Sequence, residues 1–82
     1  MDTKKIESLI YQLLEALGED PNRDGLLETP KRVAQMMEEV YEGIQYTNAE
    51  IADMYGKTFA VDTNQMVVVK DITCLSNCEH HM

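Results

Sequence analysis

Two stretches of the chain carry apolar side chains at the three- and four-residue spacing of an amphipathic helix. The first stretch has the apolar positions Ile6, Leu9, Ile10, Leu13, Leu14 and Leu17. Its spacing predicts a helix that is opened by Asp2 or Thr3, because these side chains cap free backbone amides. We expect this helix to close at Gly18, since glycine is common just after a helix C-terminus.

The second stretch repeats the pattern, with Thr29 as the expected N-cap, Pro30 in the first turn and Gly43 near the end. Its apolar positions are Val33, Met36, Met37, Val40, Tyr41 and Ile44. We expect the two apolar stripes to pack together as ordinary core, although both could equally well face other subunits. The polar loop 19–25 contains Pro, Asn, Asp and Gly, which favour turns, so it should orient one helix against the other.

After these helices the pattern changes from helix to strand near residue 57. A short third helix is expected to begin at Thr47 or Asn48 and to end at Gly56; its apolar positions are Ile51, Met54 and Tyr55. Residues 58–61 and 66–72 predict two short strands around a turn at 62–64, because the second segment is rich in β-branched residues. The chain therefore has an α+β pattern, with a helical region at 1–56 and the start of a sheet-containing domain at 57–82.

Composition limits the kinds of partner. With 82 residues, 44% hydrophobic and 27% charged, the chain has the composition of one small soluble globular domain. Its net charge of −8, from 15 acidic and 7 basic residues, argues against general binding to nucleic acid or to an anionic membrane. No apolar run approaches the ~18 residues of a membrane span, and the first residues lack the apolar core of a signal peptide, so we expect a cytoplasmic protein.

The strongest chemical signal is the run Cys-Glu-His-His at 78–81. A thiolate and an imidazole three residues apart suit zinc, so Cys78 and His81 are predicted metal ligands. A catalytic zinc normally has three protein ligands, and the third must come from Cys74, from another chain or from sequence not included here. His80 would stay free to move protons near the metal, because imidazoles titrate near neutral pH.

Two plainer interpretations of these residues stay open. Adjacent histidines can belong to an exposed turn, and Cys74 and Cys78 can be merely buried thiols. In a reducing compartment, however, two cysteines beside two histidines favour metal binding or catalysis over a disulfide.

The surrounding sequence resembles the N-terminal part of the GTP cyclohydrolase I family. The matching runs are Asp-Gly-Leu-Leu-Glu-Thr-Pro-Lys-Arg-Val-Ala at 24–34, Val-Lys-Asp-Ile at 69–72 and Ser-Asn-Cys-Glu-His-His at 76–81. The resemblance implies zinc-dependent hydrolysis of the imidazole ring of GTP, which yields formate and 7,8-dihydroneopterin triphosphate, the entry to tetrahydrofolate or biopterin synthesis. It also implies a tunnelling fold (T-fold), an antiparallel sheet with helices on one side, of which this chain would hold only the first strands.

The resemblance also assigns roles to single residues. Cys78 and His81 look like the two upstream zinc ligands, and His80 looks like a histidine that assists proton transfer during ring opening. Cys74 has no role in the family pattern, so it is either a strand residue or a substitute third ligand. The family's own third ligand, a cysteine in a His-x-Cys context, would lie in sequence absent from this chain.

Arg32 lies at the family's Pro-Lys-Arg position and is a candidate for binding the triphosphate of GTP between subunits. The alternative is a solvated surface residue paired with Glu28 or Glu39. Family members assemble as rings, commonly two stacked pentamers, which implies a homo-oligomer for the complete protein.

Two functions follow from these observations. The first is that the chain is the N-terminal part of a GTP cyclohydrolase I, active as the complete protein and inactive as 82 residues alone. The second is a truncated, non-catalytic homologue that acts as a helical interaction module or a small zinc-binding module.

Overall fold

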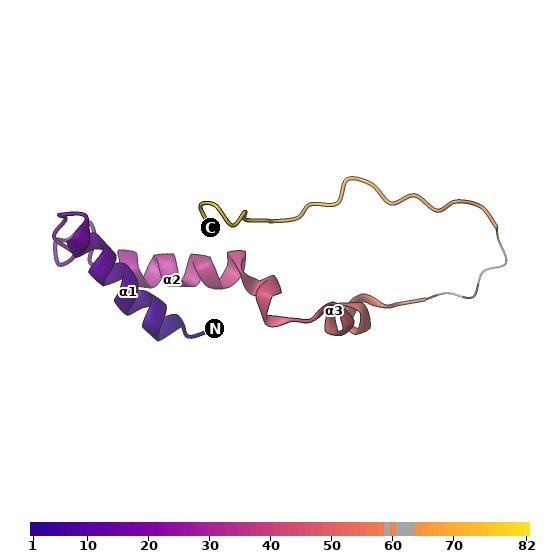
Figure 1. Cartoon of the computed structure of the whole chain (residues 1–82), viewed down its shortest axis with the longest axis horizontal. Helices are drawn as coiled ribbons and strands as arrows, with labels where there is room; N and C mark the ends of the chain where they lie inside the picture. Colours follow the sequence, from indigo (N-terminus) through magenta and orange to yellow (C-terminus); the bar gives the residue numbers. More distant parts are fainter. Residues whose placement is uncertain (59, 61–63) are drawn as a thin grey trace. The chain divides into compact units, whose positions relative to one another are not determined.

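The computed structural model describes residues 1–58, 60 and 64–82, and it divides the chain into two compact units, Met1–Gln45 and Tyr46–Met82. The described elements are the α-helices α1 (Thr3–Ala16), α2 (Thr29–Val40) and α3 (Asn48–Tyr55) and the 3₁₀ helix η1 (Glu42–Gln45), shown in Figure 1. No helix in the described part of the chain is long and apolar enough to cross a membrane.

Helix α1 has the two ends that its sequence predicts. The Asp2 carboxylate accepts a hydrogen bond of 3.0 Å from the backbone amide of Lys5, which caps the N-terminus. At the other end Gly18 has a φ of +90°, and its amide donates to the carbonyl of Glu15 at 3.0 Å. The next amide, of Glu19, donates to the carbonyl of Leu14 at 3.0 Å. These two bonds form a Schellman motif, so the predicted close at Gly18 is confirmed.

Helix α2 begins one residue earlier than predicted. Glu28 is the N-cap and makes no capping hydrogen bond through its side chain, so the prediction of Thr29 as N-cap is wrong. The reason lies in the preceding loop, where successive turns lead into the helix: the amide of Leu26 donates to Arg23 and that of Thr29 donates to Leu26. Pro30 lies in the first helical turn as expected, where its missing N–H costs no helical bond.

The C-terminal end of α2 also differs from the predicted stripe. After Tyr41 the chain tightens into η1, where the amide of Ile44 donates to the carbonyl of Tyr41 at 3.0 Å. Ile44 therefore lies outside α2, and its side chain is exposed. The apolar stripe of α2 therefore ends at Tyr41, and the predicted last position, Ile44, is not part of it.

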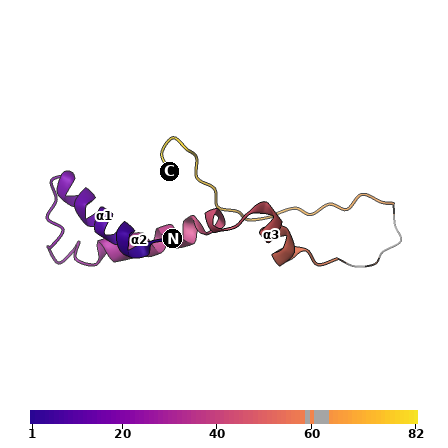
Figure 2. The same cartoon turned by 60° about the horizontal axis from the view of Figure 1, so that its bottom comes forward.

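Helices α1 and α2 lie side by side, as both Figure 1 and Figure 2 show, and this confirms the predicted packing. Ala34 of α2 is 2% exposed, and this small side chain lets the two backbones approach. The half-buried apolar residues of this contact are Ile6, Ile10, Leu14, Val33, Met37 and Val40. The other edge of the α1 stripe stays exposed, at Leu9, Leu13 and Leu17. A helical hairpin of this size thus buries only a narrow strip of each helix.

Side-chain hydrogen bonds stabilise the loop between these helices, and one pair of residues, Asn22 and Tyr11, connects it to α1. The Asp20 carboxylate accepts a bond of 2.9 Å from the backbone amide of Asn22, as in an Asx turn. The side-chain amide of Asn22 donates to the hydroxyl of Tyr11 at 3.0 Å. Pro21, which lies between Asp20 and Asn22 in the sequence, is buried. The predicted polar turns of this loop are therefore present.

In the second unit, α3 confirms the predicted short helix. The Thr47 hydroxyl caps it by accepting a bond of 3.2 Å from the amide of Glu50, and Gly56 is the C-cap. The predicted strand at 66–72 is wrong for this chain, because residues 64–82 form no strand. The predicted strand at 58–61 and turn at 62–64 include residues that lie outside the described ones.

The missing strand has a physical cause. Its apolar side chains are 70–87% exposed, at Met66, Val67, Val68, Val69 and Ile72. A strand needs neighbouring strands or a covering helix to bury one of its faces. A segment without such neighbours has no partner for backbone hydrogen bonds between strands and buries no apolar surface. The described part of the chain thus holds the helical region of the expected α+β pattern without its T-fold sheet.

Candidate metal-binding site

The run Cys-Glu-His-His ends in a turn. Residues 79–81 form this turn, directly after the extended segment that ends at Cys78. Cys78, His80 and His81 are all exposed. The turn is local, since it needs only these few residues, and it brings the backbone amides that follow Cys78 back toward its side chain.

Those amides affect the pKa of the thiol. The backbone amide of His81, and to a smaller degree that of His80, lowers the pKa of Cys78 by hydrogen bonding to the sulfur. Desolvation opposes this effect only weakly, because the side chain is exposed. A lowered pKa increases the thiolate fraction, and the thiolate is both the nucleophile and the metal ligand.

The two imidazoles are separate groups. The ring centroids of His80 and His81 are 6.5 Å apart, and the ring planes are tilted by 48°. The rings therefore do not stack on each other.

The donor set fits zinc in kind but not in number. A thiolate and an imidazole are preferred zinc ligands, and Cys78 is held toward its thiolate form. Within the described residues, however, no three Cys, His, Asp or Glu side chains gather in a way that could hold a metal ion. The structure thus does not bring Cys74, Cys78 and His81 together. Both thiols are free and exposed, so the interpretation as buried cysteines is wrong for this chain.

Arg32 is paired in the way that the plainer interpretation predicts. Its guanidinium donates to the Glu28 carboxylate at 2.7 Å, one helical turn away, and both side chains are at least 70% exposed. An exposed ion pair at this spacing is worth only about 0.3–0.5 kcal/mol. Such a pair can give way to a stronger anion at little cost, so it does not conflict with a phosphate-binding role.

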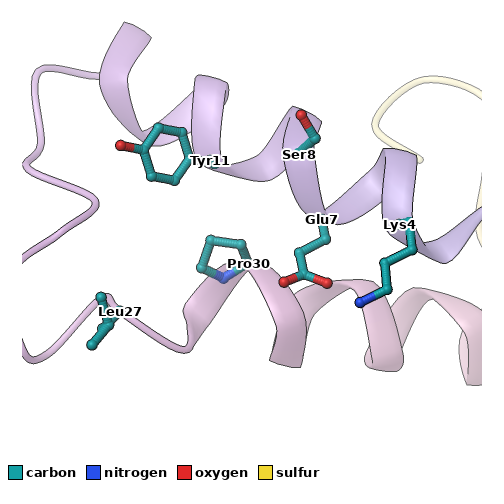
Figure 3. A pocket seen from close by; sticks show the side chains of 6 residues that line it. All are labelled: Lys4, Glu7, Ser8, Tyr11, Leu27 and Pro30. Atoms are coloured by element: carbon teal, nitrogen blue, oxygen red, sulfur yellow. The ribbon is translucent and has the colours of Figure 1, made fainter.

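A second feature of the first unit is a shallow depression between α1 and α2, seen in Figure 3. Its volume is about 340 Å³, and its lining residues are Lys4, Glu7, Ser8, Tyr11, Leu27 and Pro30. None of the residues predicted to bind metal or substrate lines it. No sequence motif pointed to this depression.

The sequence singled out the side chains of the run Cys-Glu-His-His as candidates but gave no sign of the two backbone amides that lower the pKa of Cys78. Backbone amides carry no sequence signal of their own, since every residue except proline has one. Their direction depends on the turn at 79–81, and the only hint was a short polar run after the extended segment.

Comparison with known proteins matches nearly the whole chain. A family model described as GTP cyclohydrolase I matches residues 6–82. The chain is 53% identical over 88 residues to the GTP cyclohydrolase 1 of Clostridium beijerinckii, covering 100% of this chain and 45% of that protein. It is 56% identical to the protein of the same name from Ruminiclostridium cellulolyticum, with the same coverage.

A more distant genus gives a similar match. The GTP cyclohydrolase 1 of Streptococcus mutans is 53% identical over 81 residues, covering 99% of this chain and 41% of that protein. The chain therefore spans less than half the length of these curated relatives. No solved structure matches it.

Proposed function

Because the chain belongs to the GTP cyclohydrolase I family, we propose that it is part of an enzyme that hydrolyses GTP to 7,8-dihydroneopterin triphosphate and formate. The observation that carries this proposal is the family match over residues 6–82, which includes the run Cys-Glu-His-His. The chain spans 45% of its Clostridium relative, so the activity is proposed for the complete protein. The 82 residues alone are expected to be inactive.

In this proposal Cys78 and His81 hold a zinc ion. The amide hydrogen bonds that lower the pKa of Cys78 support the assignment, because they favour the thiolate that zinc requires. Bound zinc supplies Lewis acidity for the activation of water. The third ligand lies elsewhere in the complete protein, with Cys74 as the alternative within this chain.

His80 is the proposed proton carrier. Its ring lies 6.5 Å from that of His81, so it can stay free of the metal while close to it in sequence and space. A free imidazole can protonate the ring nitrogen of guanine that leaves when the ring opens. His80 would thus act on the substrate, while Cys78 and His81 act through the metal.

Arg32 is the proposed contact to the triphosphate. A guanidinium forms charge-assisted hydrogen bonds to phosphate, and the exposed pair with Glu28 is weak enough to be exchanged for one. The proposal further includes a ring-shaped homo-oligomer, up to a decamer, and a cytoplasmic location. Two free exposed thiols suit a reducing compartment.

The test separates metal binding from proton transfer in the complete protein. We expect Cys78→Ser to lose both zinc and activity, since it removes a ligand. His80→Ala should retain zinc but lose turnover by about 10²- to 10⁴-fold, the usual contribution of a general acid or base. Zinc is measured by elemental analysis, and turnover is followed as fluorescent neopterin after oxidation and dephosphorylation of the product.

The metal content of His80→Ala is the internal control for folding. Equal loss of zinc from both variants would contradict the division of roles. Full activity in Cys78→Ser would contradict the zinc assignment itself. Turnover of GTP by the 82-residue chain supplied with zinc would show that the site is complete without further sequence.

A further inference from the structure

We propose that Asp71 is a positioning residue for the metal-binding run: its backbone forms a β-bulge in the complete protein and so determines which face of a sheet carries Cys78. The inference rests on the proposed function, because only the complete protein would supply strands with which this segment can pair. No sequence motif marked Asp71 as functional. Its backbone conformation is the observation that singles it out.

The backbone of Asp71 has a φ of +60°, in the left-handed region. Residues of a regular antiparallel strand have a φ near −140° instead. The structure describes all of residues 64–81, and Asp71 is the only one of them with a positive φ. Among residues other than glycine, Asp and Asn adopt this conformation most readily, so the residue type fits the conformation. The extended segment before Cys78 therefore has one defined irregularity.

A residue in this conformation can interrupt a strand as a β-bulge. In a regular strand, successive side chains point to opposite faces of the sheet. In a bulge of the G1 type, a residue in the left-handed region is inserted, so that two residues oppose one residue of the partner strand. From that point the alternation is shifted by one residue, and every later side chain changes face. When residues 66–75 pair with a neighbouring strand, Asp71 is thus the extra residue.

The sequence around Asp71 supports this shift independently of the backbone angle. With regular alternation, each face of a strand over 66–75 would carry one charged residue near its middle, Lys70 on one face and Asp71 on the other. With Asp71 as the extra residue, the face opposite Lys70 has no charge. This uncharged face consists of Val67, Val69, Ile72 and Cys74. An antiparallel sheet with helices on one side needs such a face toward its core.

The shift decides where the metal-binding run begins. Residues 72–78 belong to no helix, so the alternation can continue as far as Cys78. Cys74 and Cys78 are an even number of residues apart, so they share a face in either register. With the bulge, that face is the uncharged one; without it, Cys78 would lie on the opposite face. Asp71 therefore acts on the site through the backbone, without contact to metal or substrate.

The test uses single substitutions of Asp71 in the complete protein. Asn and Gly both tolerate the left-handed region, so Asp71→Asn and Asp71→Gly should keep zinc and GTP turnover at the wild-type level. A β-branched residue is strongly disfavoured there, so Asp71→Val should lose zinc and lower turnover by about 10²-fold, as expected for misplaced catalytic groups. Thr73→Val is the matched control: it places valine two residues away, at a position with no positive φ, and should change neither quantity.

Asp71→Glu separates the backbone from the carboxylate. It keeps the charge but lacks the preference of Asp and Asn for the left-handed region, so it should bind less zinc than Asp71→Asn. The opposite order would overturn the inference, because it would assign the effect to the carboxylate. Full zinc content in Asp71→Val would overturn it as well. If Asp71→Val fails to fold, as judged by far-ultraviolet circular dichroism, the comparison of Asn with Glu still decides.

A crystal structure of the complete protein gives a second measurement, which depends on neither metal nor activity. We expect Asp71 to keep a positive φ within a strand, with Val67, Val69 and Cys78 on one face. Regular alternation through Asp71 in an active protein would overturn the inference alone. A bulge at Asp71 in a protein that neither binds zinc nor hydrolyses GTP would support the placement of Cys78 and contradict the proposed function.

Discussion

The pKa of Cys78 is lowered by the backbone amides of its neighbours rather than by their side chains. The sequence predicts the residue as a ligand from the histidines beside it, yet the structure shows that the amides of His81 and His80 lower its pKa. A sequence pattern can place an imidazole three residues from a thiol. It cannot show where the amide of that residue points, because this depends on the turn that residues 79–81 adopt.

A pair of substitutions at His81 separates these two effects in a Cys74→Ser background. A lowered pKa means more thiolate at any given pH, so alkylation of Cys78 should reach half its maximal rate below the ordinary thiol value of about 8.5. His81→Pro removes the amide N–H and should move this midpoint upward. His81→Ala keeps the amide and should leave the midpoint in place. The rate of iodoacetamide labelling against pH, read by mass spectrometry, gives the midpoints; an equal rise in both variants would identify the imidazole as the cause.

At the scale of elements, the apolar spacing and the capping residues in the sequence predicted which helices form and most of their caps, but not the first residue of α2. The caps Asp2 and Thr47 and the close at Gly18 are confirmed, because each depends on a side chain or a backbone preference within one turn. The N-cap of α2 was misplaced since the turns before Thr29 extend the helical path by one residue. Bonds of this kind involve no distinctive side chain, so the sequence does not reveal them.

The Schellman motif after α1 makes a stability prediction. Gly18 has a φ of +90°, a conformation that costs a residue with a Cβ about 1–2 kcal/mol. We therefore expect Gly18→Ala to lower the free energy of unfolding by about 1 kcal/mol or more. Gly43→Ala is the matched control, because an added Cβ meets nothing within 4 Å at either position and Gly43 has no positive φ. Urea unfolding followed by circular dichroism measures both; equal effects would mean that the left-handed conformation does not matter.

At the scale of the whole molecule, the helices form from contacts within the chain, whereas residues 64–82 of the expected sheet region form no strand. The α1–α2 pair buries Ala34 between two stripes that the sequence predicts. Residues 66–72 have the composition of a strand, but β propensity reflects packing against neighbouring strands more than a preference of the backbone itself. The strand prediction for residues 66–72 failed for this chain because it read β propensity as a preference of the segment itself, whereas this propensity depends on the neighbouring strands of a sheet.

This explanation predicts a difference between the 82-residue chain and the complete protein. In the chain alone, the backbone amides of residues 66–72 belong to no strand, so they should exchange with deuterium nearly as fast as in an unfolded peptide. In the complete protein, which we propose to be about twice as long, these amides should pair with further strands and exchange many times more slowly. The amides of α1 are the internal reference, since their helix forms in the chain itself and should be protected in both samples. Hydrogen exchange read by mass spectrometry gives both rates. Fast exchange at 66–72 in the complete protein would show that this segment is not a strand there either, and protection in the chain alone would show that it finds a partner without the missing sequence.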